Sequence, residues 1–197
     1  MISSHVLRFT PAVQTRCRPV QTQGQATGAR GGFPLIDGFR FAENAGAIRG
    51  RCPVRGFARL QDQLNSNEGE LEYEVEGTTD EAGRPAIRIA VTGNVQLTCQ
   101  RCLKPLAYPL KVEETLVLAR SESEIEAQPV DPETPERILA GKDMDVGTLL
   151  EDEILLAVPF APRHDDCEPA AVGTREAQAS PFADLRGLLD RGSRARN

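Results

Sequence analysis

GELEYEVEG, residues 69–77, is the stretch of this 197-residue chain that decides its class of fold. Leu71, Tyr73 and Val75 alternate there with glutamates on either side. A period of two places successive side chains on opposite faces of a strand, so an apolar face is buried while the glutamate face meets water. The stretch therefore predicts a strand of an antiparallel sheet.

The alternation resumes after TTDEAGRP (78–85), a segment with the residue types of a turn, which predicts a β-hairpin. Gly93 interrupts the second strand in the way that a β-bulge would, and the alternation then continues to Cys99. Apolar residues recur between Tyr108 and Leu118 and predict a third long strand.

Helical patterns flank these strands. DVGTLLEDEILLAVP (145–159) predicts a helix over 145–157 that Asp145 caps, with an apolar stripe on one face. Short helices are expected in IDGFRFAENAGA (36–47) and PVRGFARLQDQL (53–64), with a short strand at 48–54 between them. The predicted fold class is α+β: an antiparallel sheet from about 68–118 that either closes into a small barrel or packs on the 145–157 helix.

The domain organisation follows from composition. Residues 1–32 contain no acidic residue and four arginines, which predicts a disordered basic extension, similar in composition to a transit peptide or explained by a start site assigned too early. Residues 33–167 are expected to form a single domain with a flexible acidic loop at 119–143. Residues 168–197 are expected to be a flexible tail with a short amphipathic helix.

Charge and cysteine content restrict the function classes. The net charge is −6, and the acidic residues are concentrated after residue 66, which argues against broad, nonspecific RNA affinity. Five cysteines without a secretory segment make a disulfide framework unexpected, so a cytoplasmic location is predicted. No apolar run approaches the ~20 residues of a membrane span, and no nucleotide-binding glycine loop occurs.

Two short motifs suggest a metal site. Cys99 and Cys102 are two residues apart in LTCQRCLKPL (97–106), and His164 and Cys167 repeat that gap in PFAPRHDDC (159–167). Together they would form a Cys₃His set, a standard tetrahedral ligand group for structural zinc. An unmetallated turn beside a mobile tail is the alternative. Dithiol redox chemistry is disfavoured, because a redox CxxC normally opens a helix and here prolines and a strand pattern follow.

Three motifs in order resemble the large ribosomal RNA subunit accumulation protein family (YceD-like proteins): VQLTCQRCLKPL (95–106), VGTLLEDEILLAVPFAPRHDDC (146–167) and SPFADLRGLL (180–189). A looser likeness extends over 33–60, so the resemblance covers roughly 33–190, whereas residues 1–32 match nothing in the pattern. It implies a non-enzymatic factor in the synthesis, processing or stability of 23S ribosomal RNA. The positions marked by the resemblance are Cys99, Gln100, Arg101, Cys102, Glu151, Asp152, Glu153, His164 and Cys167.

Two sets of charged residues surround these motifs. Arg101, Lys104 and Arg163 would offer phosphate contacts beside the zinc site to a ribosomal RNA precursor. The three adjacent acids Glu151, Asp152 and Glu153 cover a wide arc of the helix, so they cannot all share one solvated edge. Glu153, which lies beside the apolar stripe, is expected to pair with Arg101 or Lys104. Plain surface charge is the alternative. Two other functions stay open: an acidic adaptor for a basic large-subunit ribosomal protein without RNA contact, and a CxxC thiol oxidoreductase.

Overall fold

The computed structural model describes residues 18–23, 26–30, 32–127 and 135–170. Its larger sheet has seven strands, six of them in the order β1-β4-β6-β7-β8-β9, while β5 pairs with β7. Every neighbouring pair is antiparallel except β8 and β9. The strands are β1 (Arg18–Gln23), β4 (Ala47–Pro53), β5 (Leu64–Ser66), β6 (Glu70–Thr79), β7 (Pro85–Thr98), β8 (Pro105–Ala119) and β9 (Arg137–Leu139).

A second, three-stranded sheet has the order β10-β3-β2, formed by Met144–Asp145, Phe33–Ile36 and Ala26–Arg30. The helices are α1 (Gly38–Glu43), α2 (Glu122–Glu126) and α3 (Val146–Ala157), and two 3₁₀ turns, η1 (Val54–Gly56) and η2 (Arg59–Gln63), precede β5. The predicted α+β class is confirmed. Among the described residues the larger sheet is open, and it packs on α3 rather than closing into a barrel.

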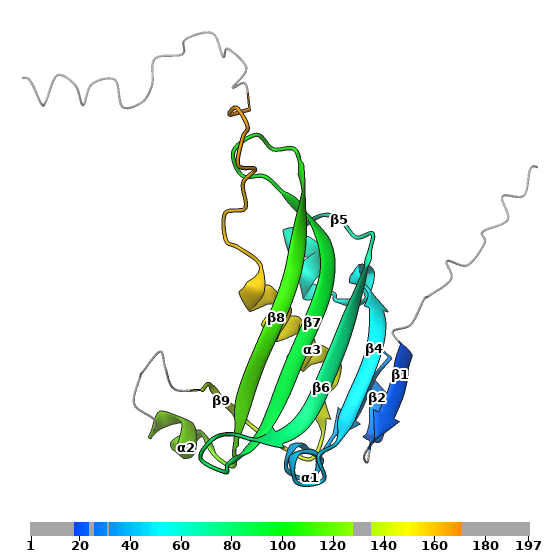
Figure 1. The fold of residues 1–197 in the computed structure, drawn as a ribbon, viewed down its shortest axis with the longest axis vertical. Helices are drawn as coiled ribbons and strands as arrows, with labels where there is room; N and C mark the ends of the chain where they lie inside the picture. The colour runs from blue at the N-terminus through cyan, green and yellow to red at the C-terminus, as the bar shows by residue number, and fades with distance from the viewer. Residues whose placement is uncertain (1–17, 24–25, 31, 128–134, 171–197) are drawn as a thin grey trace, which may run out of the picture.

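The core lies between the larger sheet and α3 (Figure 1). Leu71, Tyr73 and Val75 are buried there as the alternation predicted, and Leu150 and Ile154 of α3 are fully buried against them. Asp145 caps α3 by accepting hydrogen bonds from the backbone N–H groups of Gly147 and Thr148. The sheet and the helix therefore form where the periodicity placed them.

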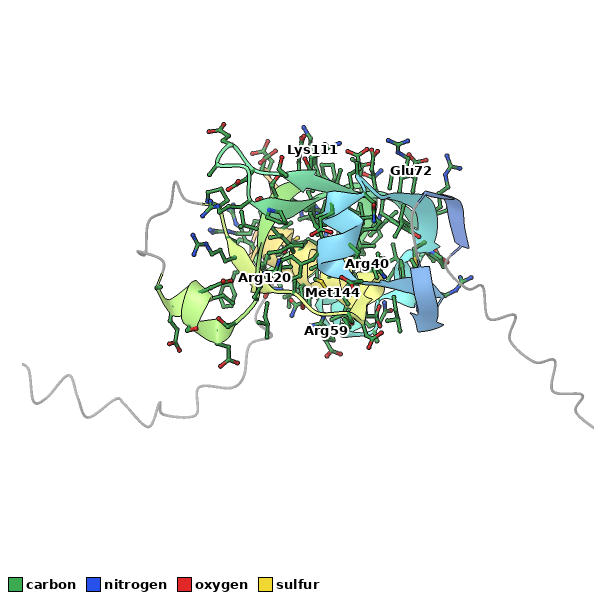
Figure 2. The ribbon with its side chains drawn as sticks, turned by 90° about the horizontal axis from the view of Figure 1, so that it is seen from below. Arg40, Arg59, Glu72, Lys111, Arg120 and Met144 are labelled. Atoms are coloured by element: carbon green, nitrogen blue, oxygen red, sulfur yellow. The ribbon has the colours of Figure 1, made fainter. Side chains whose placement is uncertain are left out.

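Charged side chains cover the opposite face of the sheet. Figure 2 shows Glu72 and Lys111 on this outer face and Arg59 on the other side. Arg49 lies between Glu74 and Glu76, and Arg88 also pairs with Glu76. Three glutamates of β6, Glu72, Glu74 and Glu76, thus pair with arginines of neighbouring strands and help to hold the sheet together.

Gly93 does not form the expected bulge. The pairing of β7 with β6 and with β8 runs through Gly93 without a shift of register. A Cβ atom at this position would lie 2.6 Å from Leu71 Cδ2 and 2.9 Å from the Glu70 carbonyl oxygen, and φ is +155°. Glycine is required here because the neighbouring strand approaches too closely for a side chain.

Other local expectations also differ from the structure. Residues 1–32 were expected to be disordered, but β1 and β2 lie there, because β4 and β3 offer open edges for pairing. The acidic loop 119–143 contains α2 and β9, since β9 pairs with the end of β8. The segment 53–64 forms the two 3₁₀ turns instead of one helix.

Two further expectations concern the tail and the cysteines. The amphipathic helix predicted in 181–197 falls outside the described residues, so it stays a prediction, as do the domain boundaries. Cys52 is fully buried and disulfide-bonded, although a disulfide framework is unexpected from the sequence, whereas Cys99, Cys102 and Cys167 are free. No helix in the described part of the chain is long and apolar enough to cross a membrane.

Candidate metal centre

The turn between β7 and β8, residues 99–104, presents the first pair of cysteines. The Cys99 N–H donates to the Lys104 carbonyl at 3.0 Å, and the Leu103 N–H donates to the Cys99 carbonyl at 2.9 Å. Leu103 adopts a left-handed conformation, with φ of 60°, which reverses the chain within a few residues. Because β7 and β8 are long and fully paired, this turn is held on a rigid support.

The segment after α3 brings the second pair to the same place. The Gln100 N–H donates to the Pro162 carbonyl at 2.8 Å, and the Ala170 N–H donates to the Arg101 carbonyl at 3.0 Å. These two bonds bracket His164 and Cys167 and fix the returning chain along the 99–104 turn. We call the two apposed segments, 99–104 and 159–170, the clasp.

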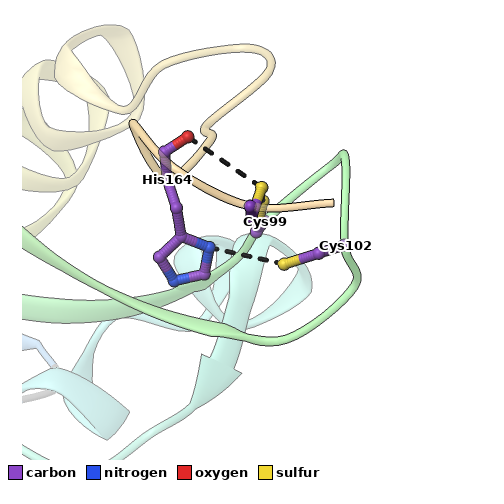
Figure 3. Close-up of side chains that lie close together, drawn as sticks. Cys99, Cys102 and His164 are labelled. Carbon is purple, nitrogen blue, oxygen red and sulfur yellow. Dashed lines mark hydrogen bonds between the residues drawn. The ribbon is translucent and has the colours of Figure 1, made fainter. Parts of the chain in front are cut away.

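The four side chains converge on one point. Their ligand atoms all lie within 4.8 Å of one another, so Cys99, Cys102, His164 and Cys167 could hold a metal ion. The Cys99 and Cys167 sulfurs are 3.8 Å apart, and the Cys102 sulfur lies 3.4 Å from His164 Nδ1. Figure 3 shows Cys99, Cys102 and the His164 ring around this point.

These two distances fit a tetrahedral ion. Zinc bonds of about 2.3 Å to sulfur and about 2.0 Å to nitrogen give edges of roughly 3.8 Å for S···S and 3.5 Å for S···N in a tetrahedron. Both observed separations agree with these edges. The donor set therefore has the chemistry and the spacing of a structural site.

The His164 ring is already oriented for binding. Its Nε2 lies 3.1 Å from the carbonyl oxygen of Pro105, the first residue of β8. A proton on Nε2 is donated to that oxygen, which leaves the lone pair of Nδ1 directed toward the sulfurs. Such a hydrogen bond fixes the tautomer and the ring plane, as is usual for histidines that bind metals.

The thiols differ in acidity. Burial by itself raises the pKa of Cys99, but hydrogen bonds from the backbone of Cys102, His164 and Arg101 lower that pKa to about 5. Burial raises the pKa of the Cys167 thiol to about 11, and hydrogen bonding with Cys99 adds to the effect. Because cysteine binds a metal as the thiolate, a bound cation would displace the proton of Cys167.

The basic residues beside the clasp do not form a purely positive surface. Arg101, Lys104 and Arg163 are all exposed, as their suggested role requires. Three exposed acids, Asp165, Asp166 and Glu168, lie in the same segment. The neighbourhood is therefore mixed in charge, which weakens the case for phosphate binding at this end of the sheet.

The acids of α3 pair with a residue that sequence reasoning did not select. Arg59 Nε lies 3.0 Å from Glu151 Oε2, and Arg59 Nη1 lies 2.6 Å from Asp152 Oδ1. Glu151 Oε1 also accepts the backbone N–H groups of Arg59 and Leu60 at 2.6 and 3.3 Å. The expected pairing of Glu153 with Arg101 or Lys104 is not formed among the described residues, where the charges that act on Glu153 are those of Glu136, Glu114 and Asp152.

Glu153 is the second buried acid of α3, and its surroundings are opposite in character. Only 6% of the residue is exposed, and its side chain has no hydrogen bond or ion pair among the described residues. Burial raises the pKa of Glu153 to about 7, and the charges of Glu136, Glu114 and Asp152 add to this.

Glu153→Gln is expected to stabilise the protein at high pH only. With a folded pKa of about 7 against 4.5 unfolded, the folded protein keeps a proton that the unfolded chain has released, so stability falls as pH rises through this window. Glutamine mimics the protonated acid, and should raise the free energy of unfolding by about 1–3 kcal/mol at pH 8 and little at pH 5. Urea denaturation of variant and parent at both pH values is the measurement; an equal difference at each pH would contradict it.

Residues 87–189 match the family described as large ribosomal RNA subunit accumulation protein YceD. That range covers more than half of the chain. The chain belongs to the YceD family. No solved structure matches it.

The YceD match contains both parts of the clasp and the whole of α3. It begins in β7, so the resemblance noted over 33–60 lies outside it, and Arg59 does too. The YceD family name connects this chain with ribosome biogenesis and with accumulation of large-subunit ribosomal RNA. In a YceD-family chain the Cys/His cluster is also a candidate zinc site.

Proposed function

We propose that this protein is a non-enzymatic factor that supports accumulation of 23S ribosomal RNA and biogenesis of the large ribosomal subunit, acting in the cytoplasm. The observation that carries the proposal is the family match over the clasp and α3. The ligand-like packing of the clasp supports a structural role for its cysteines.

Zinc is the metal that we propose for the clasp. A Cys₃His set offers soft thiolates and an imidazole, which favour zinc over magnesium or calcium. Bound zinc would supply a rigid link, with Cys99 and Cys102 holding it from the turn and His164 and Cys167 from the returning segment. Its consequence for the fold would be to fasten residues 159–170 to the end of the β7–β8 hairpin.

Deleting the gene in its own organism is expected to lower the ratio of 23S to 16S ribosomal RNA. The measurement is quantitative electrophoresis of total RNA during growth, with the intact gene restored on a plasmid as the control. The same plasmid with Cys99→Ser tests whether the clasp is needed. An unchanged ratio in the deletion strain would contradict the proposed function.

An adaptor that holds a basic ribosomal protein without contacting RNA is the second candidate. The mixed charge around Arg101, Lys104 and Arg163 favours it over direct RNA binding. Retention of labelled 23S fragments by the purified protein, measured over a range of salt concentrations, separates the two. Strong salt-sensitive binding would favour direct recognition.

A thiol oxidoreductase has less support. The low pKa of Cys99 would suit a nucleophile. However, Cys99 is fully buried, and the CxxC residues lie in a turn between strands rather than at the start of a helix. Turnover in an insulin reduction assay would support a thiol oxidoreductase activity.

A further inference from the structure

The edge of β8 that faces away from β7 is open along most of its length. At one end, Pro105 accepts the His164 hydrogen bond; at the other, the Val117 N–H donates to the Glu136 carbonyl and the Ala119 carbonyl accepts from Ala140. The β8 residues in these contacts, Pro105, Val117 and Ala119, are all odd-numbered. Because successive residues of a strand direct their backbone groups to opposite edges, the backbone groups of the odd residues between them also point outward.

Between these contacts no strand of the described structure pairs with the outward edge of β8. Lys111, Glu113 and Thr115 each present an N–H and a carbonyl there, whereas Pro109 presents only a carbonyl. An unpaired edge of this kind is a template on which another extended chain can add a strand. The open stretch from Pro109 to Thr115 spans roughly 20 Å.

The side chains next to this edge are acidic. Glu114 occupies an inward position of β8 between the buried residues Val112 and Leu116, yet it is exposed. Glu136 lies just before β9, and Glu153 approaches from α3. No described basic side chain pairs with any of these three acids.

Glu153 shows that this acidic side of the edge lacks a partner. Only 6% of the residue is exposed, its carboxyl has no hydrogen bond or ion pair among the described residues, and the charges of Glu136 and Glu114 act on it. Leu156, three residues further along the helix, lies on the same flank and is 73% exposed. These three acids are not a candidate metal group among the described residues.

We propose that the open edge of β8 binds an extended, lysine- or arginine-rich segment of a partner protein, which pairs with the backbone at 109–115 and places a cationic side chain beside Glu153. Alternate residues of such a strand point to the α3 side, where Glu114 and Glu136 offer negative charge, Glu153 can ionise beside a bound cation, and Leu156 offers an apolar contact. Backbone pairing supplies affinity, and the acids select for charge.

The inference rests on the proposed function only for the identity of the natural partner, a basic segment of an assembling large-subunit protein. The binding site itself can be tested without ribosomes. If the peptide does not bind, the proposed function can still be tested by the 23S-to-16S ratio. If that ratio is unchanged in the deletion strain, the peptide-binding site can still exist.

The test uses the full-length protein and a fluorescent peptide of about nine residues in which lysine and valine alternate. Anisotropy titration is expected to give saturable binding. Lys111→Pro should weaken it at least tenfold, because the outward N–H is lost although the β7 ladder does not use it. Lys111→Ala keeps that N–H and should bind at least as well as the parent.

Charge is tested in the same assay. Glu153→Gln and Glu114→Gln should each weaken binding about tenfold, whereas Glu72→Gln on the outer face should not. The proposal would be overturned if a peptide N-methylated at alternate residues bound as tightly as the unmodified peptide, or if Lys111→Pro bound the peptide as tightly as the parent. Either result would mean that surface charge alone accounts for the binding. No binding at millimolar peptide would also overturn it, and Pro109 and Glu114 would then only protect the edge against aggregation.

Discussion

Cys99→Ser is expected to remove the metal from the protein and release the segment 159–170 from the β7–β8 turn. Protein purified without chelator should contain about one equivalent of zinc, and the variant should contain almost none, because serine is a poor ligand for this ion. The buried core cluster includes neither Cys99 nor Cys102, so the sheet and α3 should stay folded.

Elemental analysis and hydrogen exchange are the two measurements for this variant. Faster exchange should be confined to residues around 98–105 and 159–170. Leu103→Asn is the matched control: it changes an exposed residue of the same turn that is no ligand, at a left-handed position that asparagine tolerates. Zinc absent from the parent, or equal in Cys99→Ser and the parent, would contradict the proposed site.

Glu151→Ala is expected to lower the free energy of unfolding by about 2–3 kcal/mol. The substitution leaves the N–H groups of exposed Arg59 and buried Leu60 without their acceptor, and it removes the ion pair that joins α3 to η2. Leu60 is fully buried, so water cannot easily replace the carboxylate. Urea denaturation monitored by circular dichroism measures the loss.

Asp152→Ala is the matched control for this pair. Asp152 binds the same arginine, but its side chain is 47% exposed and accepts no backbone N–H. An exposed ion pair contributes little, so a loss below about 1 kcal/mol is expected. If the two substitutions destabilised the protein equally, the backbone acceptor role of Glu151 would be wrong.

Much of the fold was predictable because its signals are local. The alternation in β6 and β7 depends only on neighbouring residues of each strand. The capped apolar stripe of α3 likewise depends on residues close together in the sequence. The hairpin and the helix form where these patterns occur. The two-residue gaps at 99–102 and 164–167 predicted the four candidate ligands for the same reason, since a tight turn can direct two side chains to one point.

The expectations that differ from the structure concern residues whose conformation or pairing depends on partners far away in the sequence. The break in alternation at Gly93 predicts a bulge, but glycine occurs there because β6 approaches closely. The segments at 18–30 and 119–143 carry weak local signals, and open strands elsewhere in the sheets pair with parts of them. Arg59 was not selected, because its partner Glu151 lies 92 residues away and nothing near either residue indicates the other.

By itself, the sequence determined the strand and helix faces, the CxxC and HxxC ligand candidates, and the family resemblance. Only the tertiary structure decided that His164 is oriented by Pro105, that Glu151 is paired while Glu153 is not, and that β8 has an open edge beside acids. The physical reason is that periodicity fixes which side chains share a face, whereas hydrogen bonds between distant segments depend on how those faces are assembled.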